Sequence, residues 1–307
     1  MATSITTTYA GEFAGKYISA ALLSADTIEG GGITVKPNVK YKEVMKTLST
    51  NALVKDAACD FADQSTVTLA EKVLTPEEFQ VNLELCKKDF HSDWEAVQMG
   101  YSAYDSLPPS FADFLIGHIA AKVAQKTEEN IWQGATATAG EFDGFTALLA
   151  ADGDVIDVTG TTVTAANVID ELGKVVDAIP TSVYGKEDLY IYVSQSIARA
   201  YVRALGGFGA SGLGANGVNN AGTTWYNGGD LAFDGVKLFV CSGMPDGKMV
   251  AAQKSNLFFG TGLLSDHNEV KLIDMGDIDG SQNVRIIMRF TSGVQFGIGS
   301  DICYYTI

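Results

Sequence analysis

Apolar and polar residues alternate along residues 79–86, where Phe79, Val81, Leu83 and Leu85 are separated by polar positions. A period of two is typical of a strand that buries one face. The pattern therefore predicts a half-buried strand over this segment.

A second alternating run, marked by Val67, Leu69 and Val73, precedes this strand, and residues 75–78 separate the two. Between residues 42 and 60 the pattern is weaker. We therefore expect residues 33–85 to form a long, mostly β excursion with little core of its own.

The strongest helical pattern covers residues 109–134. Pro109 suits the first turn, and Gly134 suits the position just past the last one. Apolar residues recur at helical spacing at Phe111, Phe114, Leu115, Ile119 and Val123. At a rise of about 1.5 Å per residue, this helix would be a rod of about 35 Å. Just before it, Ser92 and Glu95 fit a capping box that starts a shorter helix.

The second half of the chain alternates between helix and strand patterns. One helix is expected to be capped by Thr164 and ended by Pro180, and another covers residues 195–207. Strands are expected at 188–194, 236–242, 249–253, 269–275, 283–290 and 293–299. With the long helix and the β excursion, this order predicts the α+β class.

A glycine-rich stretch at residues 206–229 contains Gly207-Phe208-Gly209-Ala210-Ser211-Gly212, which matches the dinucleotide-binding pattern G-x-G-x-x-G. That pattern binds a pyrophosphate only between a strand and a helix. Here a helix is expected before it, and the following residues cannot start one. The stretch is better interpreted as a long loop whose Gly and Asn residues supply positive φ angles.

Composition and charge argue against several classes of protein. Apolar residues make up 46% of the 307-residue chain, enough for a large core. The formal net charge is −16, and the densest basic stretch, Lys36 to Lys46, is interrupted by Glu43. Because tight nucleic-acid binding needs a basic face, this class is not indicated. The sequence shows neither a signal peptide nor an apolar run long enough for a membrane span, so we expect synthesis and assembly in the cytosol.

No catalytic, cofactor-binding or metal-ligating residues are predicted. The cysteines, Cys59, Cys86, Cys241 and Cys303, lack metal or redox spacing and are expected to be free, buried thiols. The histidines, His91, His118 and His267, are far apart in the sequence. Asp274, Asp277 and Asp279 are too irregularly placed for an EF-hand, so a solvated turn is favoured over a weak cation site.

The order of elements resembles the major capsid protein of tailed bacteriophages, the Hong Kong 97-type shell fold. The resemblance is most specific in FQVNLELCKKDFHSDWEAVQMG, LPPSFADFLIGHIAAKVAQKTEENIWQG and GEFDGF, within residues 79–145. A later segment, FDGVKLFVCSGMPDGKMVAAQKSNLFFGTGL, also resembles the family. Each motif is weak alone, and their order over nearly the whole chain carries the resemblance.

The resemblance implies a division of the chain. Its parts would be an N-terminal arm (1–32), an extended β E-loop (33–85), a peripheral domain (86–155 plus about 271–307) with a spine helix (109–134), and an axial domain (about 156–270) with the glycine-rich loop (206–229). It also implies self-assembly as pentamers and hexamers into an icosahedral head, without catalysis, in the virion after assembly in the host cytoplasm. Because the sequence begins at the arm, a separate scaffolding protein is expected. A portal and decoration proteins are further expected partners, with DNA enclosed but not tightly bound.

Three alternatives stay open at this point. An encapsulin-like nanocompartment would share the fold but enclose a cargo enzyme. An α/β nucleotide-binding enzyme would need a pocket with convergent polar groups. An extracellular adhesin or tail component would show strand-rich repeats.

Overall fold

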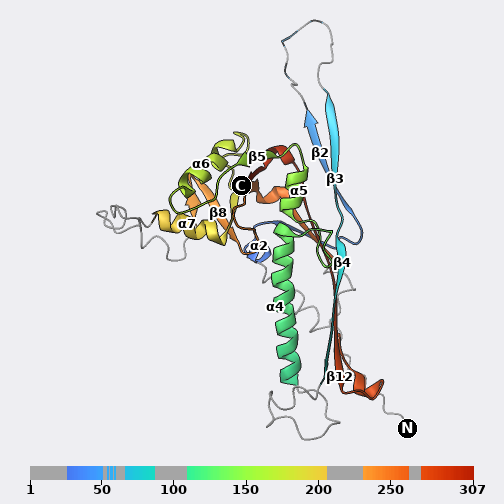
Figure 1. Cartoon of the computed structure of the whole chain (residues 1–307). Helices are drawn as coiled ribbons and strands as arrows, with labels where there is room; N and C mark the ends of the chain where they lie inside the picture. Colours follow the sequence, from blue (N-terminus) through green and yellow to red (C-terminus); the bar gives the residue numbers. More distant parts are fainter. Residues whose placement is uncertain are drawn as a thin grey trace.

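The computed structural model describes residues 26–50, 54, 56–57, 59, 66–86, 109–205, 231–262 and 271–307, with side chains omitted at 109–115, 271 and 277 (Figure 1). The first half contains α2 (Asp26–Glu29), β1 (Thr34–Pro37), β2 (Glu43–Thr50), β3 (Val67–Leu74), β4 (Glu77–Cys86), α4 (Pro109–Gln133), α5 (Phe145–Ala151) and β5 (Ile156–Thr159). The second half contains α6 (Val168–Ala178), β6 (Leu189–Ser194), α7 (Gln195–Leu205), β7 (Ala232–Phe233), β8 (Val236–Cys241), β9 (Met249–Gln253), β10 (Leu257–Thr261), β11 (Lys271–Asp274), β12 (Asn283–Phe296) and β13 (Cys303–Thr306).

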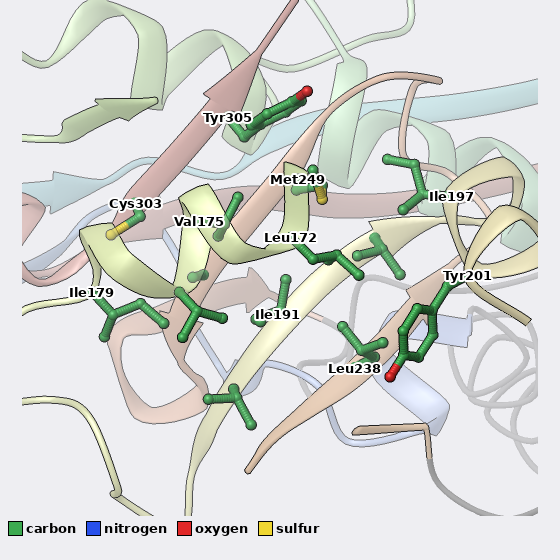
Figure 2. Packing of buried hydrophobic residues seen from close by; sticks show 14 of the residues in the cluster. Leu172, Val175, Ile179, Ile191, Ile197, Tyr201, Leu238, Met249, Cys303 and Tyr305 are labelled. Atoms are coloured by element: carbon green, nitrogen blue, oxygen red, sulfur yellow. The ribbon is translucent and has the colours of Figure 1, made fainter. Parts of the chain in front are cut away.

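A six-stranded mixed sheet, in the order β5-β13-β9-β6-β8-β7, forms one body. Helices α6 and α7 cover one face of this sheet, and apolar side chains at alternate positions of its strands point toward them. Figure 2 shows Val175 and Ile179 of α6 beside Cys303 of β13, and Tyr201 of α7 beside Leu238 of β8. The apolar residues that predict this helix, Val168, Ile169, Leu172, Val175, Val176 and Ile179, form its buried face, except for Ile169, which is 47% exposed.

The other face of this sheet packs on the end of α4. Trp132 is fully buried there, with ring centroids 5.3 Å from Tyr192 of β6 and 5.4 Å from Phe145 of α5. Tyr304 of β13 belongs to the same cluster. Because aromatic side chains dominate core energetics, this cluster joins α4 rigidly to the six-stranded sheet.

A second, long sheet lies along α4. Its order is β1-β10-β12-β11, and β4 pairs with β12 over ten residues. Val123 of α4 packs on Ile286 and Met288 of β12, with Val81 and Leu83 of β4 beside them. The alternation that predicted β4 is confirmed, since its apolar positions face the helix and its polar positions face outward.

The third sheet is the two-stranded hairpin β2–β3, which projects beyond the rest of the described chain (Figure 1). Its register pairs Glu43 with Leu74 at the base and Thr50 with Val67 at the outer end.

Most predicted elements are confirmed, including α4, α7, β6, β8 and β9. Several details are wrong. The strands expected at 283–290 and 293–299 are one strand, β12, because Ser292 pairs with both Glu77 and Thr261 and the ladder continues through it. The N-cap of α6 is Asn167, not Thr164, whose side chain instead donates to Asn167 Oδ1.

Four strands pair across the expected division of the chain, which itself stays a prediction. Strands β1 and β4, expected in the E-loop, and β10, expected in the axial domain, all pair in the long sheet. Strand β13, expected in the peripheral domain, pairs with β5 and β9 in the six-stranded sheet. A sequence can only be divided into continuous segments, and such a division does not reveal which distant strands pair in one sheet. The capping box at 92–95 and the stretch 206–229 lie outside the described residues.

Candidate functional site

The hairpin is held firmly at its base. Leu74 is fully buried and contacts Gly260 of β10, where an added Cβ would lie 2.7 Å from a Leu74 methyl carbon. Lys72 Nζ donates to Asp152 Oδ2 at 2.5 Å and lies 3.4 Å from the ring centroid of Phe296. The hydrogen bond from Lys72 is the main reason that the pKa of the Asp152 carboxyl is lowered. These contacts fix the direction in which the hairpin leaves the body.

One face of the hairpin is apolar and open to solvent. Residues that pair directly across an antiparallel ladder point to the same side, so Val44 and Val73, Leu48 and Leu69, and Val67 opposite Thr50 share this face. Their exposed fractions run from 36% at Val73 to 73% at Leu69. We call these five residues, Val44, Leu48, Val67, Leu69 and Val73, the apolar face of the hairpin.

This apolar face is unusual for a free surface. An isolated two-stranded hairpin is at best marginally stable in water, and large contiguous apolar patches mark interaction sites. Lys46 and Glu71 pair across the strands in the middle of the face and add one charge of each sign. A surface of this kind is suited to lie on another protein surface.

A second feature ties the start of the described chain to α4. Thr27 of α2 is fully buried; its backbone N–H donates to Glu128 Oε2 at 3.0 Å and its hydroxyl donates to Glu128 Oε1. Trp132 Nε1 donates to Thr27 Oγ1 at 2.8 Å. Burial raises the pKa of the Glu128 carboxyl above its ordinary value, although the hydrogen bonds from Thr27 partly offset this.

The residues after α2 continue this anchor. Tyr192 donates its hydroxyl to the carbonyl of Gly32, and Phe239 lies so close to Gly30 and Gly32 that added Cβ atoms would be 2.7 and 2.8 Å from its ring. Ile33 is buried in the same cluster. The segment that follows residues 1–25 is therefore wedged between α4 and the six-stranded sheet.

Sequence reasoning missed the contact between Thr27 and Glu128. A signal was present, because Glu128 lies on the helical stripe of Ala120, Ala124 and Trp132, all of which are buried. A carboxylate on a buried stripe needs hydrogen-bond donors, and these come from a segment 101 residues away.

The sites considered for chemistry are dispersed. Helix α7 leads directly into the glycine-rich stretch, so no strand precedes Gly207. His118 is exposed on α4, and His91 and His267 lie outside the described residues. Asp274 and Asp279 each accept from a backbone N–H two residues on, at 2.9 Å, as in solvated turns. Over the described ranges, no three His, Cys, Asp or Glu side chains gather as metal ligands.

The four cysteines are free, but they are not all buried. Cys241 and Cys303 are buried and Cys86 is partly buried, whereas Cys59 is exposed, so the prediction is wrong for Cys59. Burial raises the pKa of the Cys303 thiol to about 12, which suppresses its thiolate.

Among the described helices, none is long and apolar enough to cross a membrane.

No protein-family model matches the chain, and no curated protein matches it. Solved structures do match, over almost the whole chain. The capsid of a native GTA particle aligns with a TM-score of 0.63 at 14% identity, covering 99% of this chain and 94% of that one. Gordonia phage Cozz aligns with a TM-score of 0.59 at 12% identity, covering 100% and 91%. The capsid of cyanophage P-SCSP1u aligns with a TM-score of 0.53 at 12% identity, covering 100% and 92%.

The alignments cover 91–94% of the matched chains, and two of the three structures are described as capsids. The predicted α+β class and capsid fold are therefore confirmed, and at this identity the likeness establishes the fold alone.

Proposed function

We propose that this chain is a major capsid protein that assembles as pentamers and hexamers into the icosahedral head of a tailed phage, without catalysis. The observation that carries the proposal is the alignment of 99–100% of the chain with phage and GTA particle structures. Fold alone does not fix function, so the proposal also needs surfaces suited to assembly.

The hairpin β2–β3 supplies such a surface. In the proposed shell it is the E-loop, narrower than the 33–85 span expected from sequence, and its apolar face lies on an adjacent copy. Segments with little core of their own gain stability when a partner buries them. A firmly held base and an open apolar face suit a segment that reaches over a neighbour.

The other parts of the chain take related roles. We assign the long sheet with α4, the spine helix, to the peripheral domain, and the six-stranded sheet with α6 and α7 to the axial domain. The N-terminal arm, residues 1–32, is anchored at Thr27 and Gly32 in this assignment.

The net charge of −16 supports enclosure of DNA without tight binding. Both the chain as a whole and the packaged phosphates are negative, so net charge does not favour tight binding between them. A separate scaffolding protein, a portal and decoration proteins remain predictions.

The proposal is tested by expressing residues 1–307 alone and together with a scaffold-sized protein encoded beside its gene. Mass by light scattering and negative-stain electron microscopy of the same fractions would then be compared. We expect five- and six-membered rings or closed particles. Particles filled with an enzyme would favour a nanocompartment, and a compact monomer stabilised by a nucleotide would overturn the shell proposal.

A further inference from the structure

The side chains that anchor the hairpin β2–β3 lie on the face opposite its apolar face. Glu43 pairs with Leu74 across the ladder, and the next pair on the same side joins Met45 to Lys72. Leu74 is the fully buried residue at the base, and Glu43 accepts a hydrogen bond from Lys36 of β1 at 2.9 Å. Leu74 and Glu43 therefore hold the hairpin at one level, where it meets the long sheet.

Lys72 makes a contact further out along the hairpin. It lies two residues from Leu74, which is about 7 Å along a strand. Its ammonium group donates to Asp152 Oδ2 at 2.5 Å and lies 3.4 Å from the ring centroid of Phe296. Among the hydrogen bonds and ion pairs that join β2 and β3 to the rest of the described chain, this one is the outermost. Because it lies beyond the level of Leu74, it resists tilting of the hairpin about its base.

The groups that hold Lys72 are themselves fixed in place. Asp152 caps the end of α5, and its Oδ1 accepts from the backbone N–H of Asp154 at 2.9 Å. This turn leads into β5, an edge strand of the six-stranded sheet. Phe296, at the end of β12, is buried in the cluster that joins α4 to the same sheet. Lys72 therefore connects the hairpin to a well-packed part of the molecule, where the two larger sheets meet.

A small movement at the base grows along the hairpin. Leu69, in the middle of the apolar face, is about 17 Å from the level of Leu74, and Val67 is about 24 Å from it. If the hairpin tilts about its base, a shift of about 1 Å at Lys72 becomes about 2.5 Å at Leu69 and about 3.5 Å at Val67. A gap of about 0.5–1 Å already removes a quarter to a half of the dispersion energy of a contact. Such a tilt would therefore separate the apolar face from a surface that it fits.

We propose that Lys72 is the positioning residue of the hairpin: its contacts with Asp152 and Phe296 hold the apolar face at the angle at which an adjacent copy binds it. Lys72 lies on the opposite face of the hairpin, so it is not part of the surface assigned to the contact between copies. The consequence for assembly rests on the proposed function, whereas the angle of the hairpin is a property of a single chain.

Two single variants and their combination test the contact. Lys72→Met removes the charge and keeps an unbranched side chain, and Asp152→Asn keeps an acceptor for the backbone N–H of Asp154 but loses the carboxylate. The double variant shows whether the two residues act through one contact. The matched control is Lys126→Met, which removes another close ion pair, from Lys126 Nζ to Glu141 Oε1 at 2.6 Å, outside the hairpin.

The direction of the hairpin is measured on single chains, below the concentration at which they assemble. Spin labels are attached at Ser49→Cys on the outer half of β2 and at Asp177→Cys on α6, both exposed positions. Cys59 and Cys86 are replaced by serine, because the other two cysteines are buried. Double electron–electron resonance then gives the distribution of distances between the two labels.

We expect a narrow distribution in the labelled chain with no other substitution and in Lys126→Met. In Lys72→Met and in Asp152→Asn the distribution should be wider by about 3 Å or more, the movement expected near the outer end of the hairpin. The double variant should be no wider than Lys72→Met alone, because the second substitution removes a contact that is already lost.

Assembly of the same variants, with their natural cysteines, is measured by light scattering. If the released hairpin has the binding direction in about one-tenth of the chains, Lys72→Met needs about tenfold more protein for half-maximal assembly. Lys126→Met should assemble like the natural chain.

A distance distribution in Lys72→Met as narrow as that of the natural chain would overturn the inference. So would a double variant whose broadening is the sum of the two single ones, or unchanged assembly of Lys72→Met despite a wider distribution. A natural chain that never assembles would overturn the proposed function instead, and the distances measured on single chains would still decide whether Lys72 holds the hairpin.

Discussion

The apolar face of the hairpin can be removed without touching the core. Leu48 and Leu69 pair directly across β2 and β3 and are 65% and 73% exposed. Full burial of a leucine side chain contributes roughly 1.5–3 kcal/mol, and about two-thirds of that surface remains open here, so each leucine has roughly 1–2 kcal/mol left to contribute. Leu48→Asn with Leu69→Asn should therefore weaken each contact between copies by about 2–4 kcal/mol, or roughly 30- to 900-fold.

The matched control places asparagine on the opposite face of the same strands. Ser49 and Thr68 also pair directly and are exposed, so Ser49→Asn with Thr68→Asn introduces the same two side chains into the same strands. Both double variants should unfold at similar denaturant concentrations, whereas only the leucine variant should lose rings and particles in light scattering. Equal assembly of the two variants, or a large loss of folding stability in the leucine variant alone, would refute the assignment of this face to a contact between copies.

Three further predictions concern folding stability. The pKa of the Glu128 carboxyl is raised by burial, so the natural chain should gain stability as pH falls toward 4.5, and Glu128→Gln should flatten that rise in denaturant titrations. Burial raises the pKa of the Glu171 carboxyl, but hydrogen bonds from Lys174, Tyr305 and Thr161 outweigh this effect and lower the pKa to about 2. The resulting folding stability is present above pH 4.5 and is lost as the pH falls through 2. In Glu171→Gln, this loss of stability at low pH should be smaller. In Gly243→Ala the new Cβ would lie 2.1 Å from the Glu128 carbonyl oxygen, which should cost about 2–3 kcal/mol in calorimetry. The control Gly173→Ala, inside α6 where nothing lies within 4 Å, should leave the stability unchanged or raise it. A Gly243→Ala chain as stable as the natural one would contradict the packing described.

Local patterns predicted the elements that bury one face. The alternation at Phe79 to Leu85 and the helical stripe of α6 both describe a side that meets a core, so the periodicity of the sequence carries that information directly. Helix α4 ends at Gln133, directly before the glycine expected to follow its last turn. Packing adds a further reason for that glycine, because an added Cβ at Gly134 would lie 2.3 Å from the Phe142 carbonyl oxygen.

Pairings between distant segments could not be predicted in this way. Nothing in the local sequence of Cys303–Thr306 distinguishes a partner in one sheet from a partner in the other, and the pairing of β13 with β5 and β9 is set by the packing of the whole body. The buried contact of Thr27 with Glu128 depends on the same global arrangement. The apolar face of the hairpin was visible as an alternating pattern, but periodicity does not reveal whether Leu69 faces its own core or solvent.

A cryo-electron microscopy reconstruction of the assembled particle tests the account most directly. We predict a closed shell of five- and six-membered rings in which Leu48 and Leu69 are buried against an adjacent copy. A particle in which the β2–β3 hairpin projects into solvent on every copy, or a chain that forms no closed particle with or without a scaffolding protein, would contradict it.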